Sequence, residues 1–179
     1  MTPLTTPRLL LRRFRPEDAP ALAAYRSVPG VARYQGWTAP VSEEEARRLV
    51  RQFAEADPEV PGWFQYAAEE RESGALVGDV GVRLDANLRQ ADLGFTLAPA
   101  AQGRGYATEA VRAVLGDLFD RRGLHRVSAV CDVRNAASAR LLERVGFRRE
   151  GLRPAYTWLK GEWTDDLLYG LLADWWREE

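Results

Sequence analysis

Cysteine, histidine and lysine each occur once in this chain of 179 residues, as Cys131, His125 and Lys160. A single cysteine excludes a disulfide within the chain, and one cysteine with one histidine excludes a zinc site built from such residues. This composition is typical of a reducing compartment. We therefore expect a cytoplasmic protein with no bound metal, in which His125 is a helix cap or surface group rather than a base.

Neither an excess of charge nor a long apolar run is present. The formal net charge is −1 and the isoelectric point is near 6.0, which argues against a nucleic-acid partner. No stretch approaches the roughly 20 apolar residues of a membrane span, and the first residues, M-T-P-L-T-T-P-R, lack the layout of a signal peptide. We expect a soluble protein with one domain over residues 1–179.

The segment 99–110, P-A-A-Q-G-R-G-Y-A-T-E-A, joins a predicted strand at 90–97 to a long amphipathic helix. Gly103 and Gly105 allow a sharp turn, so successive N–H groups at the helix start can converge on a phosphate with help from the helix dipole. The sequence therefore predicts an anion-binding loop. The apolar face of the helix recurs at steps of three and four residues and consists of Ala107, Ala110, Val111, Val114, Leu115, Leu118 and Phe119.

The spacing within this loop separates the known phosphate-binding patterns. No Lys-Ser or Lys-Thr follows the glycines, which excludes the P-loop of nucleoside triphosphatases. Gly103, Gly105 and Thr108 nearly meet the dinucleotide pattern G-x-G-x-x-G, but the third glycine is missing. Gln102-x-x-Gly105-x-Ala107 resembles the signature of the GCN5-related N-acetyltransferase (GNAT) family, in which loop amides hold the pyrophosphate of acetyl-coenzyme A. A helix start whose glycines only allow the turn is the alternative.

Periodicity along the chain predicts the element order β-α-α-β-β-β-α-β-α-β-β. Ser42-x-x-Glu45 is a capping box, and Asn135 caps a short helix that Gly146 ends. Residues 27–40 have a turn-like composition and are expected to be a mobile connection, and the run 167–176 also passes for a helix by pattern. Strands are expected at 8–14, 63–69, 75–84, 90–97, 127–131, 147–159 and 163–173, and helices after 15–18, Ser42, Gly105 and Asn135.

Three further blocks resemble one branch of the same family, the RimJ/RimL-like enzymes that acetylate ribosomal-protein N termini. They are T-P-R-L-L-L-R-R-F at 6–14, R-N-A-A-S-A-R-L-L-E-R-V-G-F-R-R-E-G-L-R at 134–153 and G-E-W-T-D-D-L-L-Y at 161–169. The family resemblance as a whole extends from about Thr6 to about Trp176. The resemblance implies a single-domain α/β (α+β) GNAT fold, with a mixed, twisted central sheet of about seven strands flanked by helices.

The resemblance also implies an N-acetyltransferase that takes acetyl from acetyl-coenzyme A and transfers it to a primary amine, first of all a protein N-terminal α-amine. A small-molecule amine such as an antibiotic or polyamine is one alternative, and a coenzyme A-binding module without turnover is another. A monomer or a homodimer is expected. The coenzyme is expected to contact Phe95, Thr96 and Leu97 on the strand, Gln102, Gly103, Arg104, Gly105, Tyr106, Ala107 and Thr108 in the loop, and Asn135 and Ser138 on the short helix.

Acetylation of an amine by a thioester requires a neutral amine, stabilisation of the developing oxyanion and a proton for the departing thiolate. By the resemblance, a backbone N–H within 95–97 polarises the thioester carbonyl, and Ser138 contacts the coenzyme sulfur. Many family members carry a tyrosine where this chain has Leu142, so the usual general acid is missing. A serine hydroxyl is a poor acid, and we expect Ser138 to position the sulfur.

The sequence offers no clear general base. Some relatives carry a glutamate at the position of Thr157, and Asp92 and Glu69 are candidate replacements on neighbouring strands. Deprotonation through water would suit an α-amine, because its unperturbed pKa of ~7.7–8.0 leaves an appreciable neutral fraction near pH 7.5. The acceptor is expected to contact residues of the connection at 27–40, namely Arg33, Tyr34 and Trp37.

Overall fold

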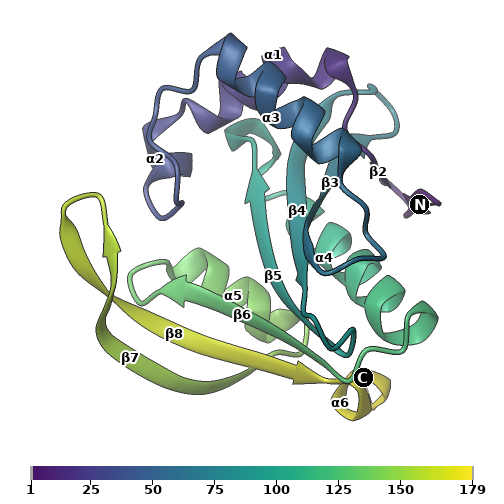
Figure 1. Ribbon diagram of the computed structural model, residues 1–179, viewed down its shortest axis with the longest axis vertical. Helices are drawn as coiled ribbons and strands as arrows, with labels where there is room; N and C mark the ends of the chain where they lie inside the picture. Colours follow the sequence, from purple (N-terminus) through teal and green to yellow (C-terminus); the bar gives the residue numbers. More distant parts are fainter. Residues whose placement is uncertain (1, 179) are drawn as a thin grey trace.

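The structure, a computed structural model, describes residues 2–178 and contains one mixed eight-stranded sheet of order β1-β2-β3-β4-β5-β6-β8-β7 (Figure 1). Neighbouring strands are antiparallel, except that β5 and β6 are parallel. The strands are β1 (Leu4–Thr5), β2 (Leu9–Arg12), β3 (Gly62–Glu70), β4 (Leu76–Leu84), β5 (Gln90–Leu97), β6 (Arg126–Asp132), β7 (Arg148–Leu159) and β8 (Glu162–Leu172).

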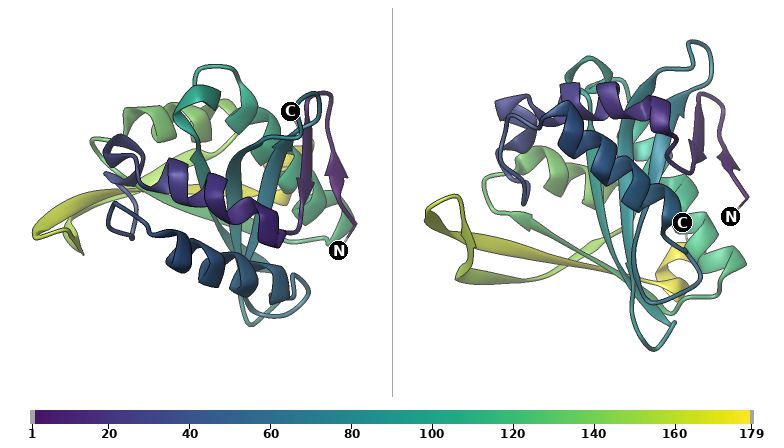
Figure 2. Two further views of the ribbon diagram at one scale, coloured as in Figure 1. Left: turned by 90° about the horizontal axis from the view of Figure 1, so that it is seen from above. Right: turned by 45° about the horizontal axis from the view of Figure 1, so that its top comes forward.

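Helices cover both faces of this sheet, with α1 and α3 on one face and α4 and α5 on the other (Figure 2). The helices are α1 (Ala19–Arg26), α2 (Pro29–Ala32), α3 (Glu43–Glu55), α4 (Tyr106–Gly116), α5 (Ala136–Arg144) and α6 (Ala173–Arg177). Short 3-10 turns lie at Pro16–Asp18 and Pro99–Ala101, and a π-helical turn at Asp117–Arg121 extends α4.

The predicted fold class and element order are confirmed, with three differences. The sheet has eight strands rather than about seven, because β1 is two residues long and too short to show a period. The connection at 27–40, expected to be mobile, contains the helical turn α2, and the Ser27 hydroxyl hydrogen-bonds to the backbone of Val41. The run 167–176 is strand up to Leu172 and helix only from Ala173.

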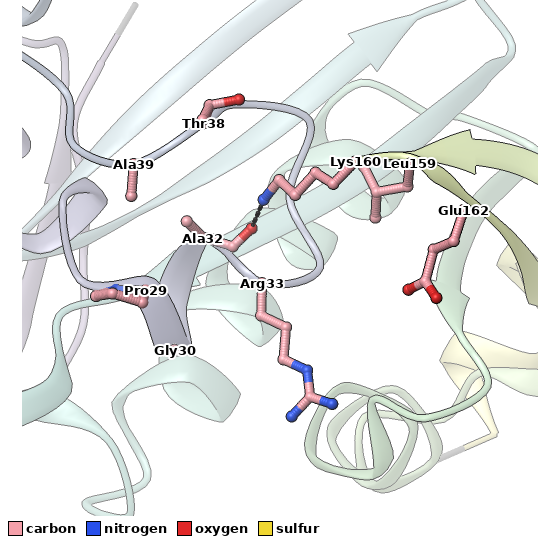
Figure 3. Close-up of a pocket in the computed structure, with 9 residues that line it drawn as sticks. All are labelled: Pro29, Gly30, Ala32, Arg33, Thr38, Ala39, Leu159, Lys160 and Glu162. Atoms are coloured by element: carbon pink, nitrogen blue, oxygen red, sulfur yellow. Dashed lines mark hydrogen bonds between the residues drawn. The ribbon is translucent and has the colours of Figure 1, made fainter.

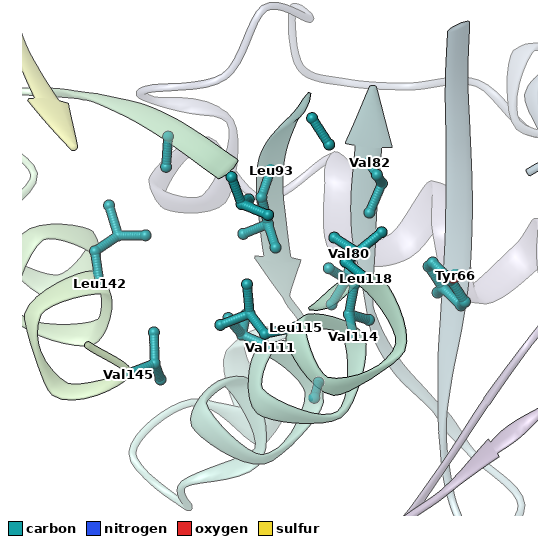
Figure 4. Packing of buried hydrophobic residues seen from close by; sticks show 14 of the residues in the cluster. Tyr66, Val80, Val82, Leu93, Val111, Val114, Leu115, Leu118, Leu142 and Val145 are labelled. Carbon is teal, nitrogen blue, oxygen red and sulfur yellow. The ribbon is translucent and has the colours of Figure 1, made fainter. Parts of the chain in front are cut away.

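The larger hydrophobic core lies between the sheet and the helices α4 and α5 (Figure 4). Val111, Val114 and Leu115 of α4 are buried in the same cluster as Val80 of β4 and Leu93 of β5, which confirms the predicted apolar face of this helix. Because β5 and α4 are both fixed by this core, the loop between them has fixed ends. The second core, beneath α1 and α3, contains Phe14, Ala19, Leu22, Ala23, Tyr25, Val41, Ala46, Val50 and Ala67.

The sheet opens between its two parallel strands. β5 and β6 pair only through Gln90–Arg126, Ala91–Val127 and Asp92–Ser128, whereas β5 stays paired with β4 to Leu97 and β6 stays paired with β8 to Asp132. Figure 1 shows the two strands diverging beyond this short ladder. The carboxyl end of β5 therefore has a backbone edge that no described strand covers, and the loop to α4 begins at the same end.

Candidate active site

The loop between β5 and α4 presents a row of backbone N–H groups. Gly103 and Gly105 have positive φ angles of 72° and 81°, and Gly105 directly precedes the first residue of α4. Within the described residues 2–178, none of the N–H groups of residues 103–108 donates to a protein acceptor. A Cβ on Gly103 would meet no atom within 4 Å, so the space there is open. Free amides at a helix N-terminus beside open space fit the pyrophosphate of a coenzyme.

Gly105 is required by the backbone as well as by any ligand. Its φ angle of 81° is left-handed, and a Cβ at this position would lie 3.3 Å from Nη2 of Arg8. A residue with a side chain would be strained there whether or not the loop bound an anion. The turn-forming interpretation and the anion-binding interpretation of this glycine therefore hold together.

The exposed edge of β5 can pair with an extended ligand. Gln102 donates through Nε2 to the carbonyl of Leu97 at 3.2 Å, and Gln35 donates through Nε2 to the carbonyl of Phe95 at 3.3 Å. Both carbonyls therefore point away from β4, and because N–H and C=O of one strand residue point to the same side, so do the two amides. Thr96 lies between them with its backbone toward β4. Of the three strand residues expected at the coenzyme, Phe95 and Leu97 offer backbone groups and Thr96 does not.

The side of the opening formed by β6 is partly apolar. Val130 of β6 is 50% exposed and Val133, just after this strand, is 42% exposed. Continuing the register of Asp92 with Ser128 along both strands brings Phe95 level with Cys131. Exposed alkyl side chains on the strand beside the opening suit the apolar parts of a pantetheine arm.

The short helix α5 carries Ser138, whose hydroxyl is expected to contact the coenzyme sulfur. Oδ1 of Asn135 accepts a hydrogen bond from the backbone N–H of Ser138 at 3.2 Å, which confirms the predicted N-cap. The hydroxyl of Ser138 makes no hydrogen bond within residues 2–178 and is partly exposed. It is therefore available to a ligand. Leu142, one turn further on, is 1% exposed and packs in the main core with Val145 (Figure 4).

The two carboxylates considered as bases are both engaged in ion pairs. Asp92 accepts hydrogen bonds from Arg83 on β4, at 2.9 Å from Nε, and its side chain is 40% exposed. Glu69 accepts from Nε of Arg12 at 2.6 Å and lies on β3, which β4 separates from β5. Each carboxylate thus has a structural role, the formation of an ion pair with an arginine, that explains its presence without catalysis. Catalysis by Asp92 stays a prediction that its ion pair does not favour, and Glu69 does not line the opening.

Two carboxylates that the sequence reasoning missed lie across the opening instead. Asp132 of β6 and Asp166 of β8 are register partners and are both buried. Asp132 accepts from Arg134 at 2.7 and 2.9 Å, and this contact holds the pKa of Asp132 below its usual value. Asp166 accepts from the Thr157 hydroxyl at 2.8 Å and from Arg153 at 3.5 Å. Thr157 thus contacts a carboxylate on the neighbouring strand.

The residues expected at the acceptor do not form one group. Trp37 donates through Nε1 to the carbonyl of Arg26 at 3.0 Å, and its ring lies 4.3 Å from Cζ of Arg26, so it packs against the second core. Contact of Trp37 with the acceptor stays a prediction, which this packing does not favour. Tyr34 donates to the carbonyl of Arg134 at 3.4 Å, and Arg33 stacks over the Tyr34 ring at 5.1 Å. These two residues lie at the end of β6.

A cleft of about 540 Å³ lies between α2 and the turn that joins β7 to β8 (Figure 3). Arg33 lines it, together with Lys160 and Glu162 from the turn. Nζ of Lys160 donates a hydrogen bond to the carbonyl of Ala32, 128 residues away in the chain, and burial lowers the pKa of Lys160. Gln35 donates from its backbone to the same carbonyl at 2.9 Å. Since the Gln35 side chain reaches Phe95, the cleft and the exposed edge of β5 are neighbours.

Similarity to known proteins decides which family this arrangement represents. The sequence model of the acetyltransferase (GNAT) domain matches residues 8–148, which include β5, the loop and α5. The chain belongs to the GNAT acetyltransferase family. It is an N-acetyltransferase by its family, and the GNAT fold uses acetyl-coenzyme A. Within residues 2–178 of this GNAT protein, no helix is both long and apolar enough to cross a membrane.

Relatives of this GNAT protein cover nearly its whole length. It is 33% identical over 170 residues to the Bacillus subtilis protein named uncharacterized N-acetyltransferase YoaA. The aligned region covers 94% of this chain and 96% of that protein. The crystal structure of a GNAT-family acetyltransferase from Bacillus anthracis superposes with a TM-score of 0.88 at 28% identity, over 97% of this chain and 99% of that one.

Other relatives of the GNAT protein are named for different amines. It is 33% identical over 84 residues to the Escherichia coli ribosomal protein uS5-alanine N-acetyltransferase. The aligned region covers 46% of this chain and 43% of that protein. The spermidine N-acetyltransferase of Vibrio cholerae, solved with coenzyme A and spermine, has a TM-score of 0.82 at 21% identity over 96% and 99% of the two chains, a likeness of fold alone.

Proposed function

We propose that this protein transfers the acetyl group of acetyl-coenzyme A to the α-amino group of a protein or peptide N terminus. The acceptor is inferred from the charged side chains around the opening, where the carboxylates are already paired with arginines. Asp132 and Glu162 both accept from Arg134, at 2.7 and 2.8 Å, and Asp166 faces Arg153 at 3.5 Å. Arg33 and Lys160 add positive charge to the cleft. A polyamine carries several positive charges and would need unpaired carboxylates here.

An α-amine suits this environment better, because the loss of one proton leaves it neutral, whereas a polyamine keeps further ammonium groups. Its unperturbed pKa of ~7.7–8.0 leaves roughly a third of it neutral near pH 7.5. The charged side chains that line the cleft are Arg33, Lys160 and Glu162, and their net positive charge favours this neutral form further. The uS5-alanine enzyme, whose name gives a protein N-terminal acceptor, is among the relatives of this chain. The position of the chain in the RimJ/RimL-like branch is part of the same proposal.

The chain's own groups can be assigned to the steps of the reaction. The amide of Phe95 would polarise the thioester carbonyl, and the loop amides of residues 103–108 would hold the pyrophosphate. The amine nitrogen forms a bond to the carbonyl carbon, the carbon–sulfur bond breaks, and the thiolate takes up a proton equivalent to the one that the amine releases. Ser138 would donate a hydrogen bond to the sulfur. Asp166, a buried carboxylate on β8 and the register partner of Asp132 on β6, could accept the amine proton through water.

The decisive experiment measures kcat/KM with three kinds of amine at saturating acetyl-coenzyme A. The acceptors are peptides with free N-terminal alanine or serine, the same peptides with a blocked N terminus and one lysine, and spermidine. We expect the free N-terminal peptides to give the highest kcat/KM. A higher value for spermidine or for the blocked peptides would refute the α-amine proposal, and binding of acetyl-coenzyme A without turnover of any amine would favour a binding module.

Residues 1–179 are proposed to act as one acetyltransferase domain in the cytoplasm. The family match and the eight-stranded sheet support the single domain, and Met1 and Glu179 lie outside the described residues. The single cysteine, Cys131, is consistent with a reducing compartment. That the active form is a monomer or a homodimer stays a prediction.

A further inference from the structure

The segment before β2 contacts the first turn of α4, about a hundred residues later in the chain. Arg8 binds Oε2 of Glu109 through Nε at 2.7 Å and through Nη2 at 2.6 Å, and its backbone N–H donates to Oε1 at 2.8 Å. The Thr6 hydroxyl donates to the same Oε1 at 2.6 Å. Burial alone would raise the pKa of Glu109, but the hydrogen bonds from Thr6 and Arg8 outweigh it and lower that pKa. The T-P-R block at 6–8 thus surrounds one carboxylate of α4.

The same arginine also holds the anion-binding loop. Nη1 of Arg8 donates to the backbone carbonyl of Arg104 at 2.8 Å, between the two glycines. The guanidinium groups of Arg8 and Arg104 lie 4.5 and 4.6 Å from the ring centre of Tyr106, on which both stack. The Tyr106 hydroxyl in turn donates to Glu70, which also binds Arg104 at 3.2 Å. Arg104 and Tyr106 are therefore each held by residues outside the loop.

A loop of this kind needs such support. Residues 102–105 are exposed, two of them are glycines in left-handed conformation, and the amides of 103–108 make no bond within the described chain. An unsupported loop would lose conformational entropy each time it ordered around a ligand, which weakens binding. Arginine is suited to the task because its planar fork binds the carboxylate through two nitrogens and the carbonyl through the third, and stacks on the ring, whereas lysine offers a single point charge.

We propose that Arg8, anchored on Glu109, is a positioning residue that preorganises the loop 102–108 for the pyrophosphate of the coenzyme. The inference rests on the proposed function, since it assumes that this loop binds coenzyme A. Arg8 acts through the backbone of Arg104 and the Tyr106 ring, and the opening, Ser138 and the cleft are not among its contacts. It should therefore set coenzyme affinity and leave the chemical step unchanged.

The test is titration calorimetry of the apo protein with coenzyme A, for the wild type and the variants R8M, R8K and E109Q. We expect a roughly tenfold higher Kd for R8M and most of that loss for R8K, which keeps the charge without the fork. E109Q is the sharpest variant, because it removes a negative charge beside the anion site. Simple electrostatics predicts tighter binding, whereas loss of the anchor predicts a Kd raised several-fold.

Arg71 provides a matched control, because it follows β3 and binds the same segment 6–8. Its Nη1 donates to the carbonyls of Thr6 and Pro7, at 2.9 and 3.2 Å, and it does not touch the loop. R71M should bind coenzyme A as the wild type does, and kcat should be unchanged in R8M and E109Q at saturating acetyl-coenzyme A. Wild-type affinity in R8K or in E109Q would overturn the inference even if R8M failed to fold. A wild type that does not bind coenzyme A would instead refute the proposed function.

Discussion

Replacement of Ser138 by alanine tests the sulfur end of the site. The structure predicts that this substitution leaves folding intact, because the cap from Asn135 uses the backbone N–H of residue 138, which alanine keeps. The hydroxyl makes no hydrogen bond within residues 2–178 and is not fully buried, so its removal leaves no buried polar group without a partner. The free energy of unfolding should change by less than about 0.5 kcal/mol.

The kinetic effect then reports only what the hydroxyl does for the reaction. If Ser138 positions the sulfur, its loss removes one neutral hydrogen bond, ~0.5–1.5 kcal/mol, and lowers kcat roughly three- to tenfold. If it is the obligatory proton donor, the loss should reach about 10²–10⁴-fold. We expect the smaller effect.

The assay is release of the coenzyme thiol at saturating acetyl-coenzyme A and peptide, followed beside the Kd for coenzyme A, because weaker binding could imitate weaker chemistry. The Tm of the variant serves as the control for folding. A hundredfold fall in kcat with Kd and Tm unchanged would refute positioning and identify Ser138 as the acid.

Three further predictions follow from the packing and the charges. Leu142→Tyr places a phenol in a fully buried position, so we expect a free energy of unfolding lower by about 1–3 kcal/mol and no gain in kcat; a rise in kcat without a fall in Tm would contradict this. Lys160→Met removes the link to Ala32 and should raise KM for the peptide without changing the Kd for coenzyme A; an unchanged KM would separate the cleft from the acceptor. Burial raises the pKa of Cys131 to about 11, above the unfolded value of ~8.5, so its contribution to stability is complete below about pH 8.5 and is lost as the pH rises through about 11. Thermal unfolding across this range should show a larger loss of stability in the wild type than in Cys131→Ser, because the tyrosines titrate in both proteins.

Features set by local sequence were predicted well. The glycines of the loop, the apolar stripe of α4 and the Asn135 cap depend on residues within a few positions of one another, and each is present in the structure. Short range also explains the confirmed hairpins, whose turns carry their own glycine signals, such as Lys160-Gly161 with φ angles of 51° and 89°.

Features that depend on distant partners were missed. The stacking of Arg26 on Trp37, a residue predicted to contact the acceptor, is one such feature. The pairing of Asp166 with Thr157 requires the β7–β8 register, including the bulge between Arg153 and Thr157, which no sequence pattern gives. The Arg8–Glu109 contact was likewise invisible, although the T-P-R block at 6–8 was a signal that this segment had a role beyond its strand.

The central claim is that the opening between β5 and β6, with the loop before α4, binds acetyl-coenzyme A. Thermal unfolding of the wild type with equal concentrations of acetyl-coenzyme A, nicotinamide dinucleotide and ATP tests it most directly. At a hundredfold excess over Kd, acetyl-coenzyme A should add about 2.7 kcal/mol to the free energy of unfolding and raise Tm by roughly 5–10 °C, with no comparable shift from the other two ligands. An equal shift with the dinucleotide, or none with acetyl-coenzyme A, would contradict the account.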